Sequence, residues 1–450
     1  MTDILALLQC LDPYVSPTTL RQMSLIVLAI ITMTGRVTML GISRWTEKGG
    51  SYRTVQRFFQ TAIPWPWVFW WFFRQHLLDS DEVYILVGDE CVVTKAGKNT
   101  HGLDRFFSSL YGKPVPSVSF FALSLVGTQE RQSYPMMAEQ VIGSEAEKAA
   151  ARAKTNEKKA QPKTEKRQPG RPKGSKNKDK TRVELTPELA RIKAMILKQL
   201  ALTNGDILIC HLALDGHFGN NNALQMAHPC GLCLISKLRH DAALHFRYDG
   251  PQSKYGSDRI YGDKINYANI PTQYLKESTS EDGMQTDIYQ AILLHKDFAQ
   301  ALKLVIIVKT DLKTGKRAPV VLFSSDLDLP YDRLIEYYSL RFPIEFNFRD
   351  AKQYWGLEDF MNVAQTPVSN AANLSLFMVN LVQLLLRVFR QDSPDAGILD
   401  LKAHFRGRKY VTETLKLLPE MPEPILLDHI FATIAQIGRI HAAEPCPNTS

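Results

Sequence analysis

Hydrophobic and polar positions divide the chain into stretches of different period, and the first 78 residues follow the helical one. Gly35 and the pair Gly49–Gly50 separate three helix-length segments, and Ser51 opens the third as a suitable N-cap. The aromatic run WPWVFWWFF is too short to span a bilayer and is interrupted by a proline. We therefore expect residues 1–78 to form a helical domain in which this run packs inside.

The period changes after the helical domain. The stretch VYILVGDECVV (83–93) is continuous and β-branched, as a strand buried on both faces should be. Residues 117–127, 206–214 and 231–239 have the same character, and a helix capped at Thr186 precedes the third of these four strands. Strands separated by helices predict a mixed α/β sheet.

Residues 240–327 are rich in tyrosine and turns, which favours antiparallel pairing. Their clearest feature is the hairpin LVIIVKTDLKTGKRAPVVLFSS, with Lys-Thr-Gly-Lys at its turn. We expect a β-rich insertion here, followed by a long apolar helix. The predicted organisation is a helical domain (1–78), an α/β core in three parts (79–145, 183–239 and 328–390), a basic insertion (146–182), the β-rich insertion (240–327) and a C-terminal helical region (391–450).

The positive charge of the chain is concentrated in one segment. The whole sequence has 54 Lys and Arg against 46 Asp and Glu, a net charge of +8, but residues 148–182 alone hold 14 against 3. The remaining chain, with 40 against 43, is slightly acidic. Such a segment is typical of a disordered region attracted to nucleic acid.

Within this segment, QPGRPKGSKNK places Arg171 and Lys173 around a proline. Gly-Arg-Pro with flanking lysines resembles the core of an AT-hook, in which an extended Arg enters a narrow, A·T-rich minor groove. A flexible tether that attracts phosphates without sequence preference is the alternative, and it is the interpretation we favour. Both predict DNA binding that weakens steeply with salt.

Composition places the chain inside the cell. It is 45% hydrophobic and 22% charged, which is ordinary for a globular protein. The six cysteines are scattered and form no disulfide framework, which fits a reducing compartment. No charged stretch followed by an apolar one and a small-residue cleavage site opens the chain. We expect a cytoplasmic protein without a membrane partner, associated with the nucleoid when bound to DNA.

Two carboxylates stand out by position. Asp89 ends the hydrophobic run VYILVG, and Asp215 ends ILICHLAL. Ligand and metal sites in α/β sheets gather beyond the carboxyl ends of strands, so neighbouring strands would bring these carboxylates together. Ionised carboxylates in one pocket repel each other and need a cation between them. Hard oxygen ligands of this kind predict Mg²⁺, with Mn²⁺ as a substitute.

The stretch YYSLRFPIEFNFRDAKQYWG adds a third carboxylate. In an unbroken helix, Tyr338, Arg341, Glu345 and Lys352 would share a sector about 60° wide. Pro343 favours a new helix start just before it, which leaves the first two on the preceding turn while the last two still share a face. A carboxylate flanked by two cations and a phenol suits a surface that handles phosphates. A solvated ion-pair face is the alternative.

The same four residues carry a resemblance. They match the Tyr-x2-Arg-x3-Glu-x6-Lys signature of cut-and-paste DDE transposases from bacterial insertion sequences, and the resemblance covers about residues 83–365. It implies a ribonuclease-H-like core with a β-rich insertion before the catalytic Glu, and a bound pair of Mg²⁺ ions. The residues that the resemblance assigns are catalytic and metal-binding Asp89, Asp215 and Glu345, phosphate-binding Arg341 and Lys352, and Tyr338 hydrogen-bonded near the terminal phosphate.

The sequence also departs from that family. Many relatives follow the first Asp with Asp and Thr, whereas this chain reads DECVV. Hairpin-forming relatives hold a flipped base with tryptophans, but here no Trp lies between Trp71 and Trp355. Phe342, Tyr248 or Tyr255 would have to stack on a base instead. The route of second-strand cleavage therefore stays open.

The N-terminal helices offer a second DNA contact. Their third segment carries Arg53 and Arg57, and three short helices with glycine turns are typical of a helix-turn-helix reader or of a packing subdomain. We favour DNA binding.

The function predicted from these features is a DNA transposase. It binds terminal inverted repeats, cleaves phosphodiester bonds by a two-metal mechanism and joins the 3′-hydroxyl ends to target DNA. Double-stranded DNA is the partner, and pairing two ends implies at least a dimer. The alternatives are a metal-dependent nuclease of the same fold without strand joining and a non-catalytic DNA-binding regulator. The three intact carboxylates argue against the regulator.

Overall fold

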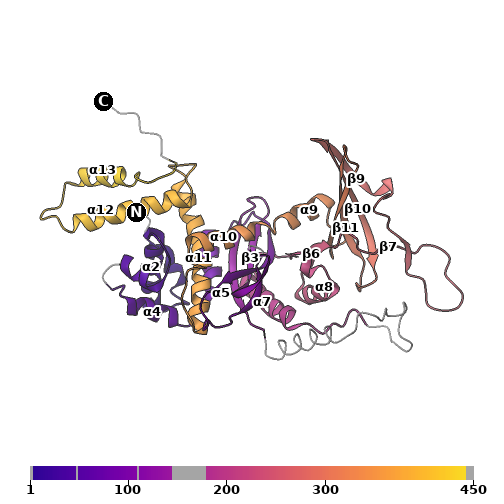
Figure 1. Cartoon of the computed structure of the whole chain (residues 1–450), viewed down its shortest axis with the longest axis horizontal. Helices are drawn as coiled ribbons and strands as arrows, with labels where there is room; N and C mark the ends of the chain where they lie inside the picture. Colours follow the sequence, from indigo (N-terminus) through magenta and orange to yellow (C-terminus); the bar gives the residue numbers. More distant parts are fainter. Residues whose placement is uncertain (1–3, 47–48, 109–110, 144–178, 442–450) are drawn as a thin grey trace.

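The computed structural model describes residues 4–46, 49–108, 111–143 and 179–441. The molecule is elongated, with the N-terminal and C-terminal helices at one end, a mixed sheet in the middle and the strands of residues 240–327 at the other end (Figure 1). Most of the predicted basic insertion, including Arg171 and Lys173, lies outside the described residues.

The N-terminal region is helical, as the sequence predicts. Ser51 caps the third segment by accepting a hydrogen bond from the Thr54 N–H. Most of the aromatic run is buried in the following helix, α5 (Trp65–His76), although Trp67 is exposed. α5 packs against the long helix α11 (Gln365–Phe389), and the Trp65 indole donates a hydrogen bond to Asn370 Oδ1 at 2.8 Å in this contact. The N-terminal elements are α1 (Ile4–Leu8), η1 (Gln9–Leu11), α2 (Pro17–Thr32), α3 (Met39–Trp45), α4 (Tyr52–Gln60) and α5 (Trp65–His76).

The described strands, which lie between Tyr84 and Ser324, all belong to one mixed sheet. Its strand order is β2-β3-β1-β5-β6-β12-β11-β10-β7-β8, with β4 paired to β3 and β9 to β10. β1 pairs antiparallel with β3 and parallel with β5, and β5 pairs parallel with β6. The strands are β1 (Tyr84–Thr94), β2 (Asp104–Ser108), β3 (Lys113–Gly127), β4 (Ser133–Val141), β5 (His211–Ala213), β6 (Cys233–Leu238), β7 (Leu244–Arg247), β8 (Tyr261–Lys264), β9 (Leu275–Glu281), β10 (Met284–His295), β11 (Leu302–Asp311) and β12 (Arg317–Ser324).

The β-rich insertion is antiparallel, as predicted, and it continues the core sheet. β10, β11 and β12 form a meander with long registers, and Gly315 takes the positive φ that the β11–β12 turn requires. β12 then pairs antiparallel with β6, so that Ser324 lies opposite Ile235. The third strand of the core is shorter than predicted, because residues 207–210 make no ladder.

Helices cover the sheet and complete the core. α11 is long and apolar enough to cross a membrane by length and composition alone, but 72% of its most apolar window is buried inside the protein. It packs on β4 and α10, and its Asn380 donates to the Pro135 carbonyl at 2.8 Å. The remaining helices are α7 (Pro187–Thr203), η2 (Gly216–Phe218), α8 (Asn221–Ala227), η3 (His228–Cys230), η4 (Thr272–Tyr274), α9 (Tyr331–Ser339), α10 (Pro343–Tyr354), α11 (Gln365–Phe389), α12 (Ile398–Leu415) and α13 (Pro424–Ile434).

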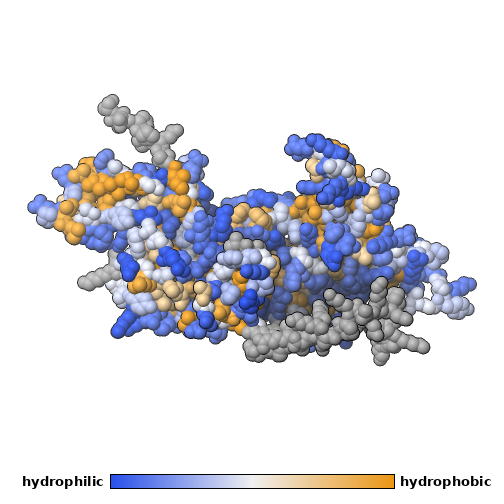
Figure 2. All heavy atoms as spheres, in the orientation of Figure 1, coloured by the Kyte–Doolittle hydropathy of each residue, from blue (hydrophilic) through white to orange (hydrophobic). Residues whose placement is uncertain are grey.

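The C-terminal region is helical in its described part and carries an apolar surface. No residue of α13 is buried. Figure 2 shows apolar side chains gathered over α12 and α13 at the end of the molecule. The exposed residues of this surface include Leu417, Met421, Ile425, Leu426 and Ile437.

The signature stretch contains the break that Pro343 predicts. α9 ends at Ser339 and α10 begins at Pro343, so the four signature residues do not lie on one helix. Tyr338 is in the last turn of α9, Arg341 is in the link, and Glu345 and Lys352 are on α10. The unbroken helix with a single polar sector therefore does not form.

Candidate active site

The sheet register places two of the carboxylates side by side. The parallel ladder of β1 and β5 ends at the pair Val87 and Ala213. Asp89 and Asp215 each lie two residues beyond that pair, so their side chains leave the same edge of the parallel strands. The predicted strand 83–93 is confirmed as β1, which continues to Thr94 through its antiparallel pairing with β3, so Asp89 lies beyond the end of the parallel ladder but inside its strand and not at the strand end.

Local contacts fix both carboxylates. Asp89 Oδ1 accepts from the Glu90 N–H at 2.8 Å, and Asp215 Oδ1 accepts from the His217 N–H at 3.0 Å as the cap of η2. Ser236 Oγ of β6 donates to the Asp215 carbonyl at 2.6 Å. Glycine before Asp89 leaves room for its neighbours, because a Cβ on Gly88 would lie 2.7 Å from Phe121 Cζ and 2.9 Å from Leu214 Cδ2, so that these side chains would have to shift.

Arg341 joins the third carboxylate to this pair. Its Nη1 donates to Asp89 Oδ2 at 2.6 Å, and its Nη2 donates to Glu345 Oε1 at 3.0 Å. The Arg341 side chain is 17% exposed and that of Asp89 21%, so this ion pair is partly withdrawn from water and stronger than a surface pair, whereas Glu345 is 43% exposed. Glu345 in the first turn of α10 is thereby held against the strand that carries Asp89.

The three carboxylates line one cleft of about 930 Å³. Burial raises the pKa of Asp89 most strongly, Arg341 lowers it, and the charges of Asp215 and Glu345 raise it, to about 6 in all. Burial also raises the pKa of the Tyr338 phenol, which lies beside Arg341. The carboxylates are therefore close enough to act on one another electrostatically.

Lys352 fastens α10 to the sheet. Its Nζ donates to the Val92 carbonyl of β1 at 2.8 Å and lies 3.7 Å from Glu358 Oε1. Lys352 lines the cleft together with the carboxylates. It thus holds the Glu345 helix in place, with one further charge directed toward the cleft.

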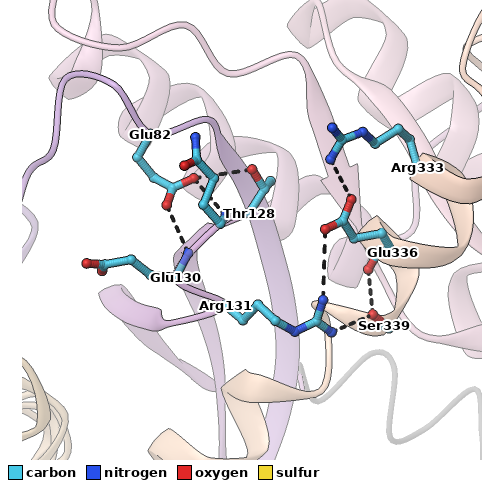
Figure 3. Close-up of polar contacts among 8 residues, drawn as sticks. Glu82, Thr128, Glu130, Arg131, Arg333, Glu336 and Ser339 are labelled. Carbon is cyan, nitrogen blue, oxygen red and sulfur yellow. Dashed lines mark hydrogen bonds and ion pairs between the residues drawn. The ribbon is translucent and has the colours of Figure 1, made fainter.

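The turn between β3 and β4 positions the end of α9 (Figure 3). Arg131 Nη2 donates to Ser339 Oγ at 3.1 Å, and Arg131 Nη1 lies 3.9 Å from Glu336 Oε1. Glu82 fixes the turn itself, because its carboxylate accepts hydrogen bonds from the backbone N–H groups of Gln129 and Glu130. Each exposed pair is weak alone, but the network sets where α9 ends and hence where Tyr338 lies.

Arg53 and Arg57, two of the other predicted DNA-binding residues, do not line the cleft. Arg53 and Arg57 are exposed on α4, away from its buried Val55, Phe58 and Phe59. The sequence reasoning missed the aromatic lip of the cleft, which comes from Phe106, Phe107 and Tyr111 of the β2–β3 hairpin. Two adjacent phenylalanines in a polar stretch were the available signal.

The donor set fits a hard divalent cation. Carboxylate oxygens are the ligands that Mg²⁺ and Mn²⁺ prefer, and Asp89 and Glu345 already converge on a positive charge. Within the described ranges, no three His, Cys, Asp or Glu side chains form a group arranged to hold a metal ion. Asp89 and Glu345 are turned toward Arg341, so a cation site requires a change of their rotamers.

Carboxylates from two strands and a helix, set beside cations in one cleft, are typical of enzymes that cut phosphodiester bonds with divalent metal ions. The family of DDE superfamily endonucleases matches residues 6–300, and the chain belongs to it. No curated protein matches the sequence. The matched span includes Asp89 and Asp215 and ends before Glu345. Membership implies a nuclease that acts on DNA, in a family that generally uses divalent metals.

Proposed function

We propose that this endonuclease is the transposase of a DNA insertion sequence. The observation that supports this most directly is the meeting of Asp89, Asp215 and Glu345 in one cleft, with Arg341 bound between two of them. The strand order β4-β3-β1-β5-β6 around the carboxylates supports a ribonuclease-H-like core. The second observation is the signature itself, from Tyr338 to Lys352.

Each residue has a defined part in the proposed reaction. Asp89, Asp215 and Glu345 would hold Mg²⁺, or Mn²⁺ in its place, which supplies water activation and charge stabilisation at the leaving 3′-oxygen. Arg341 and Lys352 hold phosphates at the DNA end, and the Tyr338 phenol donates near the terminal phosphate. These roles need Arg341 to exchange at least one carboxylate for a phosphate oxygen, which accepts the same kind of charge-assisted hydrogen bond.

Binding of DNA ends is assigned to other parts of the chain. Arg53 and Arg57 present exposed cations on α4, which suits a helix that contacts DNA. Arg171 and Lys173 of the basic insertion add nonspecific attraction. A dimer would pair two ends, and the exposed apolar surface of α13 is a candidate for the contact between copies. The protein would act in the cytoplasm, on nucleoid DNA.

The test is cleavage of the gene's own flanking DNA. A plasmid carrying the gene with its native flanks is incubated with Mg²⁺ and wild type, Asp215→Asn or Asp206→Asn. Asp206 lies before β5, the strand that Asp215 follows. It pairs with Arg74 outside the cleft, so Asp206→Asn is the matched control. We expect cuts at two flanking inverted repeats with wild type and Asp206→Asn, and none with Asp215→Asn.

Joining distinguishes a transposase from a nuclease. Pre-cleaved ends with free 3′-hydroxyls are mixed with a target plasmid, and joined products are scored. Cutting without joining would leave a metal-dependent nuclease of the same fold. Binding without any cutting by wild type, in Mg²⁺ or Mn²⁺, would overturn the enzyme and leave a DNA-binding regulator.

A further inference from the structure

A second cavity adjoins the cleft. It measures about 770 Å³ and shares Thr94, Tyr111 and Glu358 with the cleft as lining residues. We call it the groove. Its other walls come from the loop after β1, from the segment after α10 and from the turn between α2 and α3, so it leads from the cleft toward the N-terminal helices.

The groove differs from the cleft in charge. The cleft is lined by five acidic and two basic side chains, namely Asp89, Glu90, Asp215, Glu345 and Glu358 against Arg349 and Lys352. The groove is lined by three basic and two acidic ones, namely Arg36, Lys95 and Lys98 against Glu358 and Asp359. The positive balance therefore lies outside the cleft, where an anionic backbone can be held without a metal ion.

Two of the three cations are available to a ligand. Lys98 is exposed, and no described residue pairs with it. Arg36 is 70% exposed, and its Nε donates to Asp359 Oδ1 at 3.1 Å, which leaves both terminal amino groups for other acceptors. Lys95 instead supports the floor, because its Nζ donates to the carbonyls of Glu358 and Phe360 at 3.1 and 3.0 Å.

The cavity on the other side of α10 is a weaker candidate. It is lined by Arg349, Arg387 and Arg390. All three are engaged: Arg349 with Asp350 at 3.0 Å, Arg387 with Glu130 at 2.6 Å, and Arg390 with the Ala396 carbonyl at 2.8 Å. A phosphate there would have to displace existing partners, whereas Lys98 in the groove has no partner to lose among the residues that the structure describes.

We propose that the groove holds the sugar–phosphate backbone of the DNA on one side of the cleavage point, with Lys98 and Arg36 contacting phosphates. The DNA would then run from the cleft, past Tyr111, toward the N-terminal helices. This rests on the proposed function, because it takes the cleft as the place of cleavage. Phosphate contacts of this kind set position and register and carry no sequence information.

The first experiment measures binding without cleavage. A fluorescent duplex of the gene's flanking sequence is titrated with the full-length protein in EDTA at several salt concentrations. We expect Lys98→Glu to weaken binding about tenfold and Lys98→Gln to lower the slope of log K against log salt by about one. Lys198→Glu, an exposed lysine of α7 outside both cavities, should behave as wild type. Equal affinity and slope in wild type and both Lys98 variants would overturn the groove.

The second experiment locates the contact. Duplexes are shortened from one side of the cut or from the other, and the ratio of wild-type to Lys98→Glu affinity is measured for each. The ratio should fall to about one when one side is removed and stay unchanged when the other is. If the ratio of wild-type to Lys98→Glu affinity stayed unchanged on truncation from either side, Lys98 would not contact the DNA on only one side of the cut. If wild type bound with this Lys98 dependence but never cut, the proposed function would fail while the groove stood.

Discussion

The cleft and the groove share part of their lining but differ in charge. Thr94, Tyr111 and Glu358 line both cavities, yet acidic side chains predominate in one and basic side chains in the other. In the cleft, carboxylates are gathered more closely than their charges favour, and Arg341 offsets them. In the groove, Arg36 and Lys98 face solvent. The difference separates reaction chemistry from DNA attraction over a short distance, so substitutions on either side should affect different measurements.

The two cavities are also built differently. The cleft depends on sheet register and on one helix, because Asp89 and Asp215 follow paired strands and Glu345 follows a helix start. The groove depends on loops that meet from distant parts of the chain. Asp359 accepts from the Val37 N–H at 2.9 Å, which joins the segment after α10 to the N-terminal helices. The shape of the cleft should therefore tolerate surface substitutions well, because backbone pairing sets it. The shape of the groove depends on the contacts of single side chains.

The largest expected effect is loss of cleavage in Glu345→Gln. The amide keeps the shape of the side chain but removes a charge that the proposed cation needs, which should lower single-turnover cleavage by about a thousandfold. Binding in EDTA should change less than about twofold, because the groove is untouched. Glu281→Gln, on the exposed strand β9, is the matched control. Equal cleavage by Glu345→Gln and wild type would remove Glu345 from the reaction.

The next effect is on stability. Arg341→Met leaves Asp89 and Glu345 facing each other without their common cation, in surroundings partly shielded from water. We expect the free energy of unfolding to fall by about 2–3 kcal/mol, measured by urea titration in EDTA. Added Mg²⁺ should recover more stability in the variant than in wild type, because it can neutralise the same carboxylates. Equal stability of variant and wild type in EDTA would show that the cleft does not need Arg341 to offset its charge.

A smaller effect tests the contact that supports the groove from behind, between the start of the segment after α10 and the turn between α2 and α3. Gly356 has φ +87°, and a Cβ there would lie 2.5 Å from Val37 Cβ. Gly356→Ala should lower the free energy of unfolding by about 1–2 kcal/mol and weaken DNA binding, while cleavage at saturating DNA stays near wild type. Val37→Ala in the same chain should relieve the clash but not the backbone strain, so recovery should be partial. Full recovery of the free energy of unfolding would mean that only the clash with Val37 destabilises the variant. No recovery would mean that only the backbone strain at this positive φ does.

The sequence carried more information about the cleft than about the groove. Hydrophobic runs located β1, β3 and β6, and Pro343 located the helix start before Glu345, because these features act within a few residues of the chain. The predicted strand 83–93 matches β1, because its β-branched residues continue past Asp89. The sequence did not show that the parallel ladder with β5 stops before Asp89 while the antiparallel ladder with β3 continues past it, because pairing with a distant strand leaves no mark at the site itself.

The groove was missed because its contacts are long-range. Lys95 reaches carbonyls 263 and 265 residues further along the chain, and Arg36 pairs with Asp359 across 323 residues. Nothing in the local pattern distinguishes Lys98 from any other exposed lysine, since its importance comes from the cavity beside it. In the same way, only the structure shows that Arg341 bridges two of the carboxylates.

The last expected effect appears only as the pH rises and concerns Lys95 beneath the groove. Burial lowers its pKa from 10.5 to about 8, against the opposing charges of Asp359 and Glu358 and with a small contribution from Arg36. Below pH 8 the lysine is charged in both the folded and the unfolded chain, so the cost of burying its charge is present in full. As the pH rises from 8 toward 10.5, the folded chain has released the proton while the unfolded chain retains it.

Stability of wild type relative to Lys95→Met should therefore increase with pH across that window. Urea titrations of both proteins at about pH 7 and about pH 10 measure the difference, and groups that titrate in both cancel from it. A constant difference would mean that Lys95 keeps its proton in the folded chain. The floor of the groove would then carry a full positive charge throughout, and its contrast with the cleft would be larger than the geometry around Lys95 implies.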